Sequence, residues 1–183
     1  MEIIERTEGK PEVNWFSGSI TVHMSLKIKT IETFDYSDFT PIVKKFLSKF
    51  YIKTGQVIIW TRNTTFGLVP NEHEHGFLKD LIAKFKEWFP LLGTYEHNNF
   101  HNRPGVPKEE RANGYGHLMA SMLPKSITVP IIIGEMCLGK WMSIMGIELD
   151  GAREDRAVDV LLSGSFNIRR YLMACIMTRL RGL

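Results

Sequence analysis

Apolar and polar residues alternate strictly along the segment from Ser19 to Lys29. One side of this segment carries Ile20, Val22, Met24, Leu26 and Ile28, and the other carries Thr21, His23, Ser25, Lys27 and Lys29. A period of two residues is typical of a strand with one face in the core and one face in water. The pattern therefore predicts a half-buried strand here.

Two segments repeat their apolar residues at the helical spacing instead. Asp38 or Thr40 caps the first predicted helix and Pro41 opens it, and Gly55 ends it. The second is expected to end at Pro90, because proline cannot continue a helix. The apolar faces are Ile42, Val43, Phe46, Leu47 and Phe50 in the first, and Phe77, Leu78, Leu81, Ile82, Phe85 and Trp88 in the second.

The remaining apolar runs are short and rich in β-branched residues. Strands are predicted at Gln56–Trp60, around Leu68, and at residues 126–133, 136–149 (broken near Gly139) and 157–162, with Gly134-Glu135 as a hairpin turn. Residues 94–116 show neither period and predict a long loop, followed by a helical turn near Leu118–Met122. The fold class expected is α+β: a β-rich sandwich of mainly antiparallel strands with two or three helices packed on it.

Composition and charge narrow the class of protein. With 183 residues and 44% hydrophobic residues, the chain has material for one main core. Cys137 and Cys175 match no disulfide or zinc spacing, no leader is apparent, and no apolar run reaches the ~18 residues of a membrane span, so we expect a cytoplasmic protein. The net charge of +3 gives no basic stripe over the body, so no nucleic-acid partner is expected.

The C-terminal end differs from the rest. Residues 1–164 are expected to form the domain, and residues 165–183 a basic, apolar helical extension. Between Phe166 and Leu180 an amphipathic helix is predicted, with Ile168, Leu172, Cys175 and Ile176 on one face and the arginines outside. It would dock on its own or a neighbouring subunit; the alternative is a helix on a membrane surface.

Histidine is the first candidate for chemistry. Five of the six, His73, His75, His97, His101 and His117, fall within the turns and loops of residues 73–117. Imidazole titrates near neutral pH and is the commonest metal ligand, so His97, His101 and His117 are candidate ligands. The spacings match no established zinc motif, and polar loop histidines that face water explain them equally well.

The segment Asn71-Glu72-His73-Glu74-His75 lies between a predicted strand and a predicted helix. Asn71 and Glu72 could bind a divalent ion or a substrate there, or the acids could simply cap the helix.

Trp141, beside Gly139, is either a core aromatic or a ligand contact. Glu148 and Arg153 flank a turn and could form a structural ion pair.

Read in order, several strings resemble the YjbQ-like family, the proteins known as secondary thiamine-phosphate synthases. The strings are Thr64-Thr65-Phe66-Gly67-Leu68 with Asn71-Glu72, Tyr95-Glu96-His97, Asn113-Gly114-Tyr115-Gly116-His117 with Ser121, Ser126-Ile127-Thr128-Val129-Pro130, Leu138-Gly139-Lys140-Trp141 and Glu148-Leu149-Asp150-Gly151-Ala152-Arg153. The resemblance runs from about Trp15 to Gly164. The chain departs from the family at Asn63, at His75-Gly76 and at Met142.

The resemblance implies a homotrimer with clefts between subunits, which apolar Phe16, Met142 and Met145 would also favour. It further implies a weak transferase that joins a pyrimidine diphosphate to a thiazole phosphate with loss of pyrophosphate. Such a site needs Mg²⁺ and cationic groups to neutralise the developing charge.

The roles that the resemblance implies are carried by a short set of residues. Catalytic roles are expected for Glu72, His97 and His117, and substrate contacts for Asn71, Asn113, Trp141 and Arg153. Arg62 or Arg103 would add positive charge. A magnesium ion would be held by Asn71 and Glu72 through its water shell, or a zinc ion by His97, His101 and His117.

Three functions remain open on the sequence: this transferase, a metal-dependent hydrolase with a His-bound water, and a trimeric binding protein without catalysis. The ligand expected is a small phosphorylated molecule. Bound zinc would favour the hydrolase, protection of the cleft by phosphate would favour the transferase, and neither observation would favour the binding protein. We expect His97 and His117 to face one cleft with Asn71 and Glu72.

Overall fold

The computed structural model describes residues 1–14, 18–107, 109–166, 169 and 172–173. Trp15, Phe16 and most of the predicted C-terminal helix lie outside these residues. The helix does not begin at Phe166, however, because Phe166 is the last residue of a strand. None of the helices among the described residues is long and apolar enough to cross a membrane.

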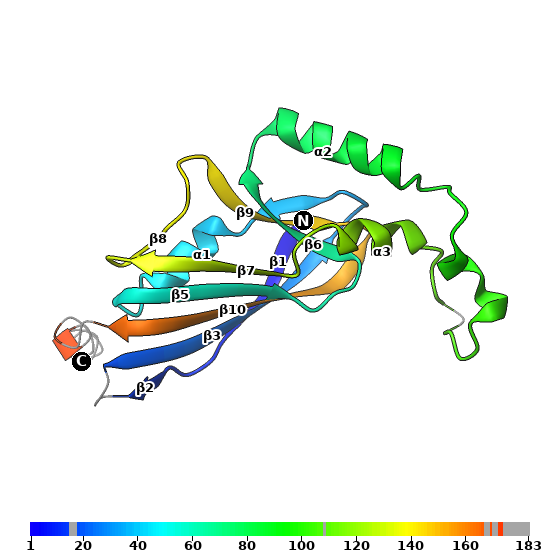
Figure 1. The fold of residues 1–183 in the computed structure, drawn as a ribbon. Helices are drawn as coiled ribbons and strands as arrows, with labels where there is room; N and C mark the ends of the chain where they lie inside the picture. Colours follow the sequence, from blue (N-terminus) through cyan, green and yellow to red (C-terminus); the bar gives the residue numbers. More distant parts are fainter. Residues whose placement is uncertain (15–17, 108, 167–168, 170–171, 174–183) are drawn as a thin grey trace.

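In the part of the chain that the structure describes up to Phe166, the fold consists of two antiparallel sheets and three α-helices (Figure 1). The larger sheet has the order β1-β3-β10-β5-β7-β8, with β2 also paired to β3, and the smaller sheet has the order β4-β9-β6. The strands are β1 Glu2–Glu8, β2 Glu12–Asn14, β3 Ser19–Thr30, β4 Tyr36–Asp38, β5 Ile52–Thr61, β6 Phe66–Glu72, β7 Ser126–Ile132, β8 Glu135–Met136, β9 Met142–Glu148 and β10 Arg153–Phe166. The helices are α1 Thr40–Leu47, α2 His75–Trp88 and α3 Gly114–Ser121, with the short 3-10 turns η1 Glu96–Asn98 and η2 Phe100–Asn102. The predicted α+β class is confirmed.

Two apolar layers hold these elements together. The alternating residues of β3 pack with the inner faces of β5, β7 and β10, with α1, and with Phe66, Leu68 and Ile144 of the smaller sheet. On the other side of that sheet, Met145 and Ile147 of β9 pack against α2 and α3. Strand β9 is therefore buried on both faces, and Met145, fully buried in this chain, contributes nothing to an exposed apolar surface.

The boundaries correct several predictions. Helix α1 ends at Leu47, so Gly55 lies inside β5 and does not terminate the helix. No side chain caps α1 at its N-cap residue, Phe39, although the Thr40 N–H donates to Asp38 Oδ1 at 2.8 Å. Strands β1, β2 and β4 were not predicted, and the loop of residues 94–116 contains η1, η2 and the start of α3.

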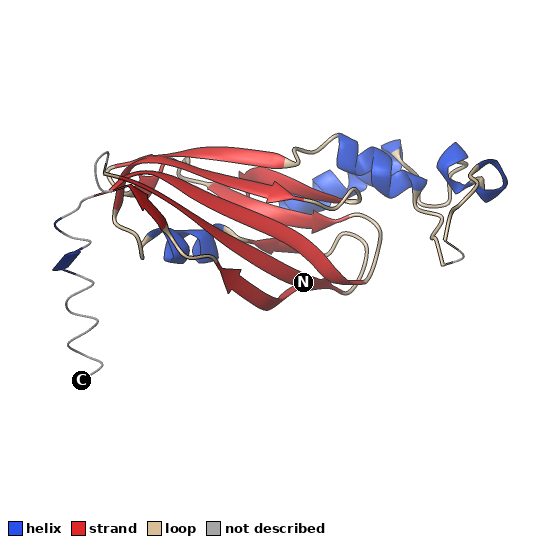
Figure 2. Cartoon of the chain, turned by 90° about the horizontal axis from the view of Figure 1, so that it is seen from below, coloured by secondary structure: helices blue, strands red, loops and turns tan. Residues whose placement is uncertain are grey.

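The molecule has two distinct ends along its strands. The η1 and η2 turns project beyond one end, next to α3, while the β7–β8 hairpin and the end of β10 lie at the other (Figures 1 and 2). The candidate site lies at the first end.

Candidate functional site

Two of the predicted histidines meet where η1 packs on the start of α3. The ring centroids of His97 and His117 are 4.3 Å apart. Asn98 fixes this approach, because its Oδ1 accepts the Gly114 N–H at 2.9 Å. Arg103 closes the loop from the other side by donating from Nη1 to the His97 carbonyl at 2.7 Å. These two hydrogen bonds fix the backbone of the segments that carry the two imidazoles.

Helix α3 is also held against the turn between β9 and β10. A Cβ atom on Gly116 would lie 2.6 Å from the Leu149 carbonyl oxygen and 3.5 Å from Thr65 Cγ2. The turn itself needs Gly151, whose φ of +106° disfavours any other residue. This contact places His117, on α3, close to Asp150 and Arg153.

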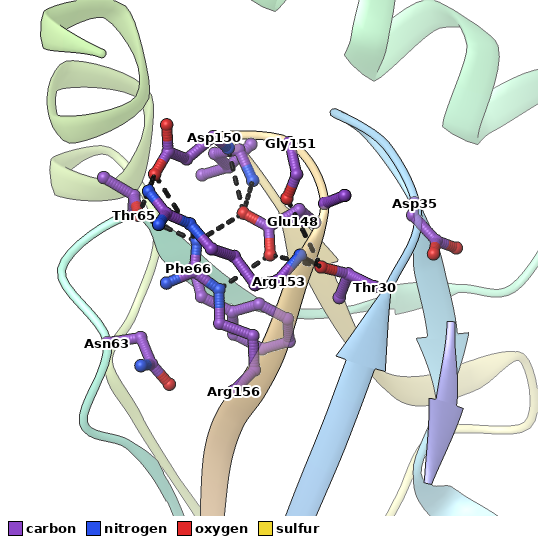
Figure 3. A network of polar contacts seen from close by, with 12 residues as sticks. Thr30, Asp35, Asn63, Thr65, Phe66, Glu148, Asp150, Gly151, Arg153 and Arg156 are labelled. Carbon is purple, nitrogen blue, oxygen red and sulfur yellow. Dashed lines mark hydrogen bonds and ion pairs between the residues drawn. The ribbon is translucent and has the colours of Figure 1, made fainter. Parts of the chain in front are cut away.

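A buried polar network supports the turn from below (Figure 3). Glu148 is fully buried, and its two carboxylate oxygens accept from Arg156 at 2.5 and 2.7 Å. The same carboxylate accepts from the Thr30 hydroxyl at 2.9 Å and from the N–H groups of Leu149 and Asp150 at 3.0 and 2.9 Å. A buried carboxylate with this many donors is fully satisfied, so its role is to hold the turn.

Above this network, Asp150 and Arg153 form an ion pair through Asp150 Oδ2. Thr65 connects the two levels, because its hydroxyl accepts from Arg156 at 2.9 Å and lies 3.5 Å from the same Asp150 oxygen. The Asp150 carboxylate is nearly buried, whereas the Arg153 side chain is 30% exposed. The guanidinium therefore reaches the surface next to Asp150, whose charge also acts on His117.

Four buried polar atoms around this point have no hydrogen-bond partner among the residues that the structure describes. They are His97 Nε2, Asn113 Oδ1, Asp150 Oδ1 and Arg153 Nε. Buried polar groups are normally paired, and each exception requires an explanation. Their chemistry is mixed, because Arg153 Nε donates while the carboxylate and amide oxygens accept. We call His97, Asn113, His117, Asp150 and Arg153 the histidine cluster.

The charge state of His117 follows from its surroundings. Burial lowers the pKa of His117, and the neighbouring His97 lowers it further, while Asp150 opposes the shift. The neutral imidazole, which both accepts and donates one hydrogen bond, is therefore favoured near neutral pH.

Three residues predicted for the site lie apart from the cluster within this chain, and a fourth, His101, is exposed. Asn71 and Glu72 are exposed at the far end of β6. Phe66 begins β6 beside Thr65 and the cluster, and at about 3.3 Å per residue Glu72 lies roughly 20 Å from it. Trp141, 66% exposed, lies just before β9 with Lys140 over its ring, and His101 is exposed on η2. One chain thus does not place Asn71 and Glu72 beside the histidines.

The three-histidine metal site is also not assembled. Within the described ranges, no three His, Cys, Asp or Glu side chains are grouped so that they could hold a metal ion. A zinc site needs at least three protein ligands, and the histidine pair supplies two imidazoles. The described residues of one chain therefore supply fewer ligands than a resident zinc ion needs.

Some polar residues have structural roles. Glu74 is the N-cap of α2 and accepts from the Gly76 and Phe77 N–H groups at 2.7 and 2.8 Å, so the capping interpretation is correct for it. Asn63 Oδ1 accepts the Ala157 N–H at 2.8 Å. His75 is the exposed first residue of α2, and Met142 is exposed at the start of β9.

Asp150 and Arg156 were missed, and the ion pair suggested for Glu148 and Arg153 is wrong. Glu148 pairs with Arg156, and Arg153 pairs with Asp150. A signal was present: Glu148 follows the apolar run Ile144–Ile147, where a charge that continues a buried strand must find a buried partner.

Comparisons with known proteins match most of the chain. The profile of the family described as "UPF0047 protein YjbQ-like" matches residues 24–165. A UPF0047 protein from Archaeoglobus fulgidus is 30% identical over 135 residues, covering 74% of this chain and 97% of the relative. Another, from Methanothermobacter thermautotrophicus, is 32% identical over 139 residues, covering 76% of this chain and 90% of the relative.

Solved structures share the fold. A YbjQ-like protein of unknown function from Sulfolobus solfataricus is 28% identical, with a TM-score of 0.71 over 80% of this chain and 99% of the other. A hypothetical protein from Aeropyrum pernix is 26% identical, with a TM-score of 0.67 over 78% of this chain and 98% of the other.

Proposed function

The chain belongs to the UPF0047 YjbQ-like family, and on that premise we propose that it binds a small phosphorylated molecule at the histidine cluster and acts as a weak transferase of the thiamine-phosphate synthase type. The substrates would be a pyrimidine diphosphate and a thiazole phosphate. The proposal rests chiefly on the four unpartnered polar atoms of the cluster.

The cluster offers groups suited to such a ligand. The half-exposed Arg153 guanidinium can form charge-assisted hydrogen bonds to phosphate oxygens, and the imidazoles of His97 and His117 can donate to the same anion. Asp150 Oδ1 and Asn113 Oδ1 accept instead, which suits a ligand that also carries a hydroxyl or an amine. A ligand with both kinds of group would pair all four atoms.

In the proposed reaction, a ring nitrogen of the thiazole attacks the pyrimidine methylene carbon, the bond from that carbon to the diphosphate oxygen breaks, and pyrophosphate leaves. Arg153 would stabilise the charge that develops on the leaving group. Asp150 Oδ1 would, in place of pairing with a ligand hydroxyl or amine, help to hold a magnesium ion, and that ion would neutralise part of the charge.

Pyrophosphate binding tests the proposed site. We expect pyrophosphate to raise the melting temperature of the protein, and Arg153→Gln or His117→Gln to weaken its binding at least tenfold, because each removes a hydrogen bond to a charged group. Arg6→Gln, the same change on β1, is the matched control and should bind normally.

Calorimetric titration measures the affinities. Unchanged affinity in both cluster variants would contradict the site. Binding of pyrophosphate and of both substrates without release of pyrophosphate would instead contradict the transferase and leave a binding protein.

We further propose that the protein assembles as a homotrimer in which Asn71 and Glu72 of one subunit approach the histidine cluster of the next. This arrangement would reconcile the family resemblance with the distance of roughly 20 Å within a chain. The exposed Trp141 and Met142 beside these two residues would be covered by the contact.

Light scattering at micromolar concentration should give a mass about three times 21.1 kDa. Neither Glu72→Gln nor His117→Gln chains alone should release pyrophosphate from the two substrates. Trimers formed by mixing the two should regain this activity, because some interfaces then hold both native residues. A monomer, or mixed trimers as inactive as their parents, would contradict the shared site.

A further inference from the structure

The tip of the β7–β8 hairpin carries an apolar residue in an unfavourable conformation. Ile132 pairs with Glu135, so the turn consists of Ile133 and Gly134, one residue earlier than the predicted Gly134-Glu135. Both have positive φ, +53° and +87°. Such turns favour asparagine followed by glycine, and a β-branched residue at positive φ is strained. Ile133 is nevertheless there, and it is 84% exposed.

A hollow adjoins this tip. A cavity of about 360 Å³ is lined by the hairpin and by the turn that leads from α1 into β5, including Leu47, Tyr51 and Ile52. Tyr51, like Ile133, is a bulky residue with positive φ, at +53°. A second cavity of about 280 Å³ shares Leu47 and Gly134 with the first. We call Tyr51, Ile132 and Ile133 with these cavities the hairpin surface. Backbone strain and exposed apolar side chains both cost stability, so their occurrence together at the hairpin surface indicates a function for it.

The surroundings of the hairpin surface are cationic. Lys44 and Lys53 line the cavities and are exposed, and Glu135 is the only acid among the described residues that line them.

We propose that this end of the molecule docks on an anionic lipid membrane surface, with Ile132 and Ile133 inserted among the lipid headgroups and Lys44 and Lys53 facing the lipid phosphates. Apolar insertion and basic residues together give peripheral binding that neither gives alone. A second copy of the chain would bring the same lysines face to face, which opposes a symmetric contact. Ile132 and Ile133 at the tip have no flat ring for stacking on bases, and Tyr51 gives the hairpin surface a single ring, so nucleic acid is the less suitable anion.

Co-sedimentation of the full chain with vesicles tests the proposal. We expect binding to vesicles that contain phosphatidylglycerol, no binding to phosphatidylcholine alone, and weaker binding at high salt. Ile133→Asn should weaken binding roughly tenfold, because it removes an apolar side chain that becomes buried when the protein docks on the membrane. The same change should keep or raise the melting temperature, because asparagine tolerates positive φ.

A Lys44→Gln/Lys53→Gln variant should also bind roughly tenfold more weakly, since each lysine contributes to attraction by the anionic surface. Ile31→Asn is the matched control. Ile31 is 65% exposed, but it follows β3 at the end of the molecule away from the β7–β8 hairpin, so this variant should bind like the native chain. Failure of the native chain to bind anionic vesicles, or native-like binding by Ile133→Asn, would overturn the proposal. So would binding to single-stranded RNA that Ile133→Asn abolishes while vesicle binding is unaffected.

Discussion

Replacing Arg156 with methionine is expected to lower the free energy of unfolding by about 3–5 kcal/mol. The substitution leaves the carboxylate of Glu148 fully buried without its cation. The Thr30 hydroxyl and two backbone N–H groups would remain as donors, but they carry no full positive charge. Urea unfolding at neutral pH measures the loss.

Two further variants show whether the buried charge is the cause. Replacing both Glu148 and Arg156 with methionine should recover much of the stability, because a pair of apolar residues leaves no unpaired charge in the core. Arg62→Met breaks an exposed ion pair with Asp159 and should cost no more than about 1 kcal/mol. A loss in the double variant as large as the loss in Arg156→Met would contradict this explanation.

The sequence was most informative where one physical requirement controls the pattern. In β3, one face is buried and the other is wet along twelve residues, so the alternation is unbroken. Strand β1 was missed because its register shifts between Ile3 and Glu5, and a bulge of this kind disrupts the two-residue period. Strand β9 gave an apolar run because both of its faces are covered.

The histidine cluster was predicted in part for a similar reason. His97 and His117 belong to segments that flank one loop, so the chain can bring them together locally. The position of α3 on the rest of the molecule depends on long-range contacts, such as its approach to Leu149, and no local spacing encodes these contacts. The same limit explains the wrong partner for Glu148: a register shift in β10 between Arg153 and Arg156 decides which arginine enters the core.

Gly116 is the residue whose replacement best separates the position of the site from its chemistry. In an exposed helix, Gly→Ala stabilises by up to about 1 kcal/mol, because alanine is the better helix former. At Gly116 the added Cβ would lie 2.6 Å from the Leu149 carbonyl, which is backbone and cannot rotate away. Overpacking of this kind costs about 1–3 kcal/mol, so we expect Gly116→Ala to be net destabilising.

The same substitution should weaken pyrophosphate binding although it removes no group that contacts the ligand. Helix α3 must move away from the β9–β10 turn, and His117 then moves relative to Asp150 and Arg153. Small displacements of this kind reduce binding by tenfold or more when several hydrogen bonds must form together. Thermal unfolding and calorimetric titration, the latter well below the melting temperature, measure the two effects separately. Gly9→Ala is the control, because a Cβ there would make only ordinary contacts with His23, at 3.5 and 3.8 Å, so both properties should be unchanged. A more stable Gly116→Ala protein with native affinity would mean that the contact between α3 and Leu149 does not position the cluster.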